Sequence, residues 1–303
     1  MKHTDVFSGC HPVVLFLYFT LVLLFSMILM HPVCLAISLC AAALYALYLR
    51  GASVLRFGAA CLLPTALLAA FLNTAFNHAG MTILAYLPSG NPLTLESLAY
   101  GLAAALMLCA VLLWFFCCNA VMTTDHFVYL FGRILPALSL VLSMTLRFIP
   151  RFTQQLRVIR EAQCGLGEKA AEKTLLQRMK NGVTALSILL TWSLENAIET
   201  ADSMKSRGYG LPGRTSFSIY RLDRRDGALL LWLALCGLLL TAGVWTGGIR
   251  WRYFPAVRGA LWGPLPTGIQ LLYLALCLTP VSLDAAAGHA WKKARMENEA
   301  LQK

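Results

Sequence analysis

The chain has 303 residues, of which 58% are hydrophobic and only 13% are charged. A soluble domain of this size would carry roughly 25% charged residues, so the composition predicts a polytopic membrane protein. The formal net charge of +11 would also suit a nucleic-acid binder. Most basic residues, however, lie in loops and in one central block, where the positive-inside rule already accounts for them. We therefore expect the lipid bilayer, and no nucleic acid, as a partner.

Six apolar runs are long enough, or nearly so, to cross a hydrocarbon core that needs ~20 helical residues. They are residues 13–30, 33–49, 57–73, 97–118, 227–246 and 268–284. Basic residues beside the second run and after the last run place both termini in the cytoplasm. The first run is longer than a typical signal-peptide core and no small-x-small site follows it, so we interpret it as a span.

These runs predict an all-α fold with about six transmembrane helices and a cytoplasmic domain of long amphipathic helices. We expect three parts, which are residues 1–133, 134–226 and 227–303. The first and last parts would hold the transmembrane helices. Residues 134–149 are apolar but short, and we expect them to descend from the membrane into the cytoplasmic part.

The ten cysteines do not form a metal-binding pattern. Most lie inside or beside apolar runs, no Cys-x-x-Cys pair occurs, and no histidines cluster near them. We interpret them as small apolar side chains in reduced form, and we expect neither a metal nor another cofactor.

Residues 174–206 contain no proline, and their apolar side chains recur every three or four positions, which is the helical period. This apolar stripe consists of Met179, Val183, Leu186, Leu190, Leu194, Ile198 and Ala201. The predicted helix ends at Ser206-Arg207-Gly208, because glycine readily takes the left-handed conformation that stops a helix. Arg207 would then lie at the helix end, and the helix would serve as an arm that docks onto a partner.

A first amphipathic helix is predicted from Pro150 to Gln163, because proline is favourable at a helix start. Gly165 and Gly167 would end it. Alone, this segment is equally compatible with a helix resting on anionic headgroups. Two such helices bracketing one cytoplasmic unit favour the docking of soluble partners.

Other polar residues have simpler interpretations than catalysis. Glu195 and Glu199 lie one turn apart, but without a nearby histidine or metal motif we interpret them as a solvated or salt-bridged helix face. For Asn73, Asn77 and His78 we favour helix capping over a ligand site. Thr94 and Glu96 fit the first turn of a helix, as N-cap and as favourable acid.

The stretch Met204-Lys205-Ser206-Arg207-Gly208-Tyr209, after a long amphipathic helix, resembles the second coupling motif of a known family. This family is the transmembrane T component of energy-coupling factor (ECF) transporters. Three further stretches are similar to that family and come in the same order. They are Asn73–Gly80, Thr94–Gly101 and Leu146–Pro150.

The resemblance implies a non-catalytic scaffold of an ABC-type importer in the bacterial cell membrane. It would join two cytoplasmic ATPase subunits to a small membrane protein, the S subunit, which binds a vitamin or a metal ion. The chain carries no Walker motif, in keeping with ATP hydrolysis by the partners. The implied ATPase contacts are Arg160, Gln163, Cys164, Gly165, Ser206, Arg207 and Gly208. The implied S-subunit contacts are Met179, Val183, Leu186, Leu190, Leu194 and Ile198.

The chain departs from the family pattern at two places. The first coupling site reads Ala162-Gln163-Cys164-Gly165 and lacks the family's arginine, for which Arg160 could partly substitute. Thr74 and Ala79 replace the usual proline and arginine of the first similar stretch. A membrane-embedded enzyme, or a stand-alone permease with an interfacial amphipathic domain, remains the alternative function.

Overall fold

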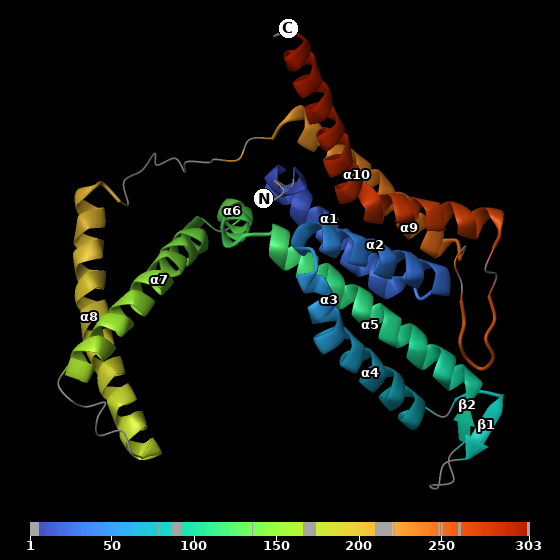
Figure 1. Ribbon diagram of the computed structural model, residues 1–303, viewed down its shortest axis with the longest axis horizontal. Coiled ribbons are helices and arrows are strands. Elements are labelled where there is room, and N and C mark those ends of the chain that lie inside the picture. The colour runs from blue at the N-terminus through green and yellow to red at the C-terminus, as the bar shows by residue number, and fades with distance from the viewer. Residues whose placement is uncertain are drawn as a thin grey trace. The chain divides into compact units, whose positions relative to one another are not determined.

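The computed structural model of the chain is built almost entirely of helices (Figure 1). The structure describes residues 6–77, 79–86, 92–134, 136–165, 174–209, 220, 222–247, 249, 251–259 and 262–301. Its internal contacts divide it into two units. Residues 1–126 and 220–303 form the membrane unit, and residues 127–219 form the paired-helix unit.

The membrane unit contains most of the helices. They are η1 (Phe7–Gly9), α1 (Pro12–Ile28), α2 (Pro32–Arg50), α3 (Ser53–Phe57), the π-helical turn η2 (Gly58–Leu62), α4 (Leu63–Phe76), α5 (Leu95–Val121), α9 (Arg224–Trp245) and α10 (Pro264–Leu301). Helix α6 (Thr124–Ile134) begins at its edge. A two-stranded antiparallel hairpin, β1 (Ile83–Tyr86) and β2 (Pro92–Thr94), precedes α5.

Among the described residues, five helical segments are long and apolar enough to cross a membrane. They are Pro32–Arg50, Gly58–Phe76, Leu95–Val121, Arg224–Trp245 and Pro264–Gly288. Helix α1 is also apolar but shorter, with 17 residues. Each of the six predicted runs coincides with one of these six segments to within a few residues. The predicted all-α, polytopic membrane fold is confirmed.

Local sequence explains where the first two helices begin. Both start with a His-Pro pair, in which proline occupies the first turn and its fixed φ suits a helix start. The Nδ1 atoms of His11 and His31 accept the backbone N–H groups of Val13 and Val33, each at 3.3 Å. Histidine therefore acts as the N-cap residue in both helices.

A buried polar network ties four helices of the membrane unit together. The hydroxyl of Ser26 in α1 lies 2.8 Å from that of Ser38 in α2 and 2.9 Å from that of Tyr273 in α10. Trp114 Nε1 in α5 donates to Ser38 at 3.0 Å. All four side chains are buried. Inside a membrane, a hydroxyl that leaves such a network has no water to bond with. The mutual pairing of these side chains therefore holds the four helices in one arrangement.

The entry to α5 confirms one sequence prediction. Thr94 is the N-cap residue, and its side chain accepts the N–H of Ser97 at 3.3 Å. The Glu96 carboxylate accepts the hydroxyl of Thr82 at 2.6 Å and its backbone N–H at 3.2 Å. The acid of the first turn therefore fastens the segment before β1 to the start of α5.

The predicted capping group at the end of α4 is only partly described. Asn77 is the C-cap residue of α4, and its side-chain oxygen accepts the N–H of Ala79 at 3.2 Å. Asn73 Oδ1 is buried and has no hydrogen-bond partner among the described residues. His78 lies outside the described residues.

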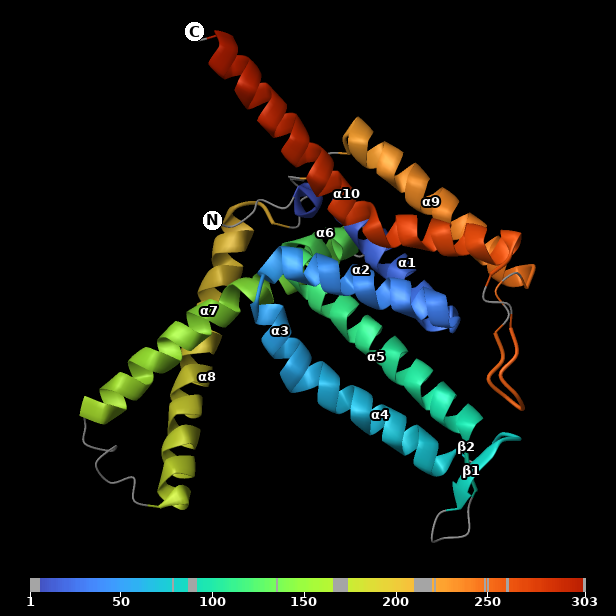
Figure 2. The same ribbon diagram turned by 45° about the vertical axis from the view of Figure 1, so that its right-hand side comes forward.

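The paired-helix unit consists mainly of α7 (Pro136–Gly165) and α8 (Leu175–Ser206), which cross each other (Figure 2). Helix α8 matches the predicted bounds to within one residue. The predicted helix start at Pro150 is wrong, because this proline lies inside α7. An internal proline removes one backbone hydrogen bond, and α7 continues past this position to Gly165. Gly165 is the last residue of α7, and Gly167 lies outside the described residues.

Candidate docking site

The C-terminus of α8 ends in a well-formed capping motif. The N–H of Tyr209 donates to the carbonyl of Met204, and that of Gly208 donates to Lys205, each at 3.0 Å. Gly208 has a φ of 79°, in the left-handed region that glycine adopts without steric cost. This bonding pattern is the Schellman motif. The predicted glycine stop is confirmed, and it leaves Arg207 as the exposed C-cap residue.

The cap fixes the backbone that carries Arg207. The backbone carbonyls of the last turn, which have no partner inside the helix, accept hydrogen bonds from the residues of the cap. The helix end is therefore stable without a binding partner. Lys205 and Arg207 also lie at the negative end of the helix dipole, which stabilises such cations by ~0.3–1 kcal/mol. The helix end is therefore a stable platform, whether or not a partner binds there.

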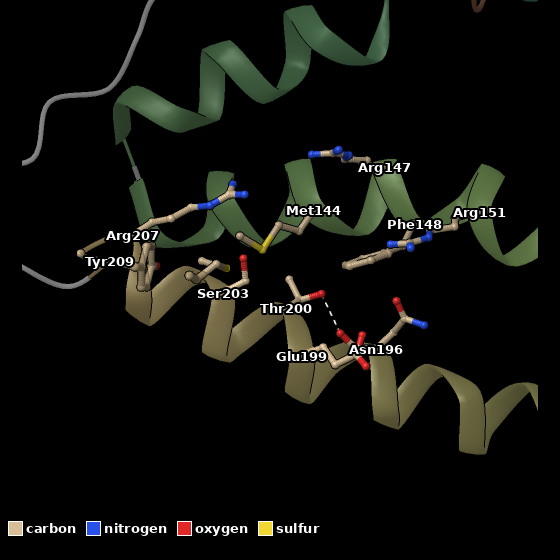
Figure 3. A pocket seen from close by; sticks show the side chains of 12 residues that line it. Met144, Arg147, Phe148, Arg151, Asn196, Glu199, Thr200, Ser203, Arg207 and Tyr209 are labelled. Carbon is tan, nitrogen blue, oxygen red and sulfur yellow. Dashed lines mark hydrogen bonds between the residues drawn. The ribbon is translucent and has the colours of Figure 1, made fainter.

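A cavity of about 720 Å³ opens between α7 and the C-terminal half of α8 (Figure 3). Its α7 wall carries Met144, Arg147, Phe148 and Arg151. Its α8 wall carries Asn196, Glu199, Thr200, Ser203, Met204, Arg207, Gly208 and Tyr209. The side chains of Arg147 and Arg207 extend toward one another from the two helices (Figure 3). The cavity thus adjoins the predicted docking arginine directly.

Positive charge dominates the lining of this cavity. Three arginines face a single acid, Glu199. The Arg151 guanidinium lies over the Trp192 ring, 5.8 Å from its centroid, so its charge has an aromatic partner. Neither Arg147 nor Arg207 forms an ion pair with any carboxylate in the part of the chain that the structure describes. Two guanidiniums without a carboxylate partner among the described residues therefore face an open cavity.

An aromatic cluster holds α7 against α8 beside the cavity. Phe148 stacks on Phe152 with ring centroids 5.8 Å apart, and Phe152 meets Trp192 edge-on at 5.9 Å. Ile159 of α7 and Ala185 of α8 are the buried residues of this pair. The two helices therefore pack through a short contact centred on aromatic and small side chains.

The apolar stripe of α8 lies on a different face from the one that packs on α7. The α7-facing side consists of buried and half-buried residues spaced by three or four. They are Asn181, Ala185, Leu189, Trp192, Asn196, Thr200 and Met204. The six predicted S-subunit contacts are all exposed, with relative residue accessibilities of 53% to 70%. This large apolar surface is unpartnered among the described residues, which is unusual for a stable monomer in water.

The first predicted coupling site lies apart from the cavity. Arg160, Cys164 and Gly165 are exposed at the C-terminal end of α7, and Gln163 is half-buried. None of them lines the cavity. At ~1.5 Å per residue, Arg160 lies about 20 Å further along α7 than Arg147. The structure therefore brings Arg147 and Arg151 to Arg207, and leaves the first site separate.

Sequence reasoning did not assign Arg147 and Arg151 to a site. The available signal was their spacing of four residues, which places both on one helical face. That spacing could not identify the helix they would meet, because about 50 residues separate them from the α8 wall of the cavity.

Residues 9–217 match the protein-family model described as CbiQ, cobalt transport protein. The chain is also similar to proteins named energy-coupling factor transporter transmembrane protein EcfT. It is 38% identical over 108 residues to that of Lacticaseibacillus paracasei, 34% over 112 residues to that of Bacillus selenitireducens, and 35% over 104 residues to that of Lactococcus lactis subsp. cremoris. These alignments cover 35%, 37% and 34% of this chain and 39%, 42% and 39% of the relatives. The chain thus matches about two fifths of each relative's length.

Proposed function

The chain belongs to the CbiQ family of cobalt transport proteins, and on this premise we propose that it is the transmembrane scaffold of an ECF-type importer. In this role it couples ATP hydrolysis by two partner ATPases to uptake by a separate S subunit. It is itself non-catalytic. The substrate, a vitamin or a metal ion, is bound by the S subunit and not by this chain.

The observation that carries the proposal is the construction of α8. It is a 32-residue helix without proline, it ends in a Schellman cap, and its last residue is followed by the exposed Arg207. At ~1.5 Å per residue it is about 48 Å long. A helix of this length, closed at its end and crossed by α7, can transmit a push at its tip without local unfolding.

The two ends of the paired helices supply separate contacts for two ATPases. The first contact is the C-terminal end of α8, where Arg207 lies between Ser206 and Gly208. The second contact is the Arg160–Gly165 end of α7. Arginine can bind a partner carboxylate through two parallel charge-assisted hydrogen bonds. Among the described residues 160–165 at the α7 end, the one arginine is the exposed Arg160, one turn before the position of the missing arginine. We therefore propose unequal contacts with the two ATPases.

The apolar stripe of α8 is the proposed surface for the S subunit. Apolar contact is non-directional, so such a surface can slide as the helix tilts and can serve partners of varied sequence. In this mechanism, nucleotide-driven closure of the ATPases moves the helix ends, and the stripe passes the tilt to the S subunit. The membrane unit stays in the cell membrane with both termini in the cytoplasm.

Substitution of Arg207 tests this proposal. In the co-expressed complex, Arg207→Glu should greatly reduce the amount of ATPase that co-purifies with the chain, because it replaces attraction with repulsion. The matched control is Arg157→Glu, a charge reversal at an exposed position of α7 outside both sites. Thermal unfolding and gel filtration should show that both variants stay folded. Co-purification of the ATPases with Arg207→Glu at the wild-type yield would contradict the proposal.

Two further substitutions test the rest of the assignment. Cys164→Arg restores an arginine at the α7 end and should maintain or strengthen assembly. Leu190→Asp places a charge in the stripe and should release the S subunit while the ATPases stay bound. If the wild-type chain retains no ATPase at all, the stand-alone permease or membrane-embedded enzyme becomes the better interpretation.

A further inference from the structure

We propose that the cavity between α7 and α8 receives an acidic segment of a docked ATPase, in which one carboxylate is shared by Arg147 and Arg207. This inference rests on the proposed function, because it takes the partner to be that ATPase. It adds Arg147, a residue of the other helix, to the docking contact at the end of α8.

The arrangement of charge carries the inference. Arg147 and Arg207 come from different helices and point toward one another across the cavity (Figure 3). Both are always protonated at physiological pH, and no carboxylate among the described residues pairs with either. Two facing cations repel each other unless an anion lies between them. A carboxylate in this position would accept hydrogen bonds from both guanidiniums and neutralise the repulsion.

The size and lining of the cavity favour a peptide segment over a single ion. Its volume of about 720 Å³ falls within the ~300–1,000 Å³ range of pockets that enclose whole ligands. Met144, Phe148 and Met204 offer an apolar wall for the residue beside the acid. Methionine suits this use, because its flexible side chain adapts to partners of different shape. The hydroxyl of Ser203 faces the same space and suits the backbone of the segment, whereas the Thr200 hydroxyl already donates to the carbonyl of Asn196 at 2.6 Å.

An anionic lipid headgroup is the less suitable occupant. The acyl chains of a lipid need a continuous apolar surface that starts at the headgroup. The apolar stripe of α8 lies on another face than the cavity, and the α8 wall is mostly polar, with Asn196, Thr200 and Ser203. The cavity therefore matches an acidic protein segment better in both charge and polarity.

A shared carboxylate would also have a mechanical consequence. Arg147 belongs to α7 and Arg207 to the end of α8, so one partner side chain would fasten both helices together. A push delivered to the tip of α8 would then reach α7 at the same moment. Glu199, on the same wall, would repel a second acid and so fix the direction in which the segment enters.

The test uses the complete transporter complex and the affinity of the chain for its ATPases. Arg147→Gln should weaken this affinity about tenfold or more, since hydrogen bonds to charged groups are individually strong. Arg157→Gln, on the same helix but outside the cavity, should leave it unchanged. Glu199→Gln removes the acid of the lining and should strengthen binding. Because Arg147 and Arg207 would share one carboxylate, the losses from Arg147→Gln and Arg207→Gln should not multiply in the double variant.

Several outcomes would overturn the inference. Wild-type affinity in Arg147→Gln, or losses that multiply in the double variant, would show that the two arginines do not share a ligand. If Arg147→Gln keeps the ATPases but loses co-purifying anionic phospholipid, measured by native mass spectrometry, the cavity is a lipid site. If Arg207→Glu releases the ATPases and Arg147→Gln does not, this inference fails and the proposed function stands. If the wild-type chain binds no ATPase, the proposed function fails as well.

Discussion

The close packing of α4 on α5 depends on Gly101, and we expect this position to reject even a single methyl group. A Cβ atom there would lie 3.0 Å from the carbonyl oxygen of Ala70 and 3.0 Å from Thr74 Oγ1. The Thr74 hydroxyl donates to that same carbonyl at 2.8 Å, so neither group can retreat unless α4 moves. Overpacking of this kind costs about 1–3 kcal/mol, whereas alanine gains roughly 0.5–1 kcal/mol over glycine in a helix. The net expectation for Gly101→Ala is a loss of about 0–2.5 kcal/mol, with a midpoint of about 1 kcal/mol.

Thermal unfolding of the purified chain measures this effect. For domains of 150–250 residues, 1 kcal/mol shifts Tm by about 2–4 °C, so the midpoint loss for Gly101→Ala should lower Tm by roughly 2–4 °C. The matched control is Gly268→Ala in α10, where an added Cβ would meet nothing within 4 Å. This control should keep Tm or raise it slightly. If both variants unfold at the same temperature, α4 and α5 do not approach as closely as described.

Three other predictions concern buried polar groups. Glu96→Gln should lower Tm, because it removes the charge from the hydrogen bonds that this carboxylate accepts from the hydroxyl and the backbone N–H of Thr82. Asp284→Ala should expose the N-terminal segment to limited proteolysis, since Asp284 Oδ1 accepts the N–H groups of Val6 and Phe7 at 2.8 and 3.3 Å. Burial lowers the pKa of His126 below its ordinary 6.5, so the unfolded state binds this proton more tightly. Stability should therefore be full above pH 6.5 and fall as the pH drops below it, and His126→Gln should remove that part of the pH dependence of Tm.

Local signals were sufficient for the positions of the apolar spans and for the bounds of α8. The absence of proline and the three-to-four spacing predicted α8, and Gly208 predicted its end, because each depends only on neighbouring residues. The six apolar runs predicted the spans for the same reason. Whether a run can cross a bilayer depends on its own length compared with the bilayer thickness, and not on the rest of the chain.

Contacts between residues far apart in the chain could not be predicted from the sequence. The pairing of Ser26 and Ser38 with Tyr273 joins residues up to 247 positions apart, and nothing in the local pattern distinguishes these hydroxyls from others in the spans. The same holds for Arg147 and Arg207, which line one cavity because α7 and α8 cross. Pro150 misled the prediction, since the local preference of proline for a first turn yielded to the continuity of α7.

The division of α8 into separate faces explains how one helix can serve several contacts at once. Its α7-facing side mixes polar and small side chains with a few large apolar ones, and the contact is centred on Trp192, Ala185 and their partners in α7. A short contact leaves the crossing angle less constrained than a continuous apolar seam would, because fewer side chains must repack when the angle changes. The exposed stripe and the capped Arg207 end remain available for other surfaces. Helix α8 can therefore transmit a movement in the proposed way. The short contact with α7 allows it to tilt, its continuous length keeps it stiff, and its stripe and Arg207 end are free to bind partners.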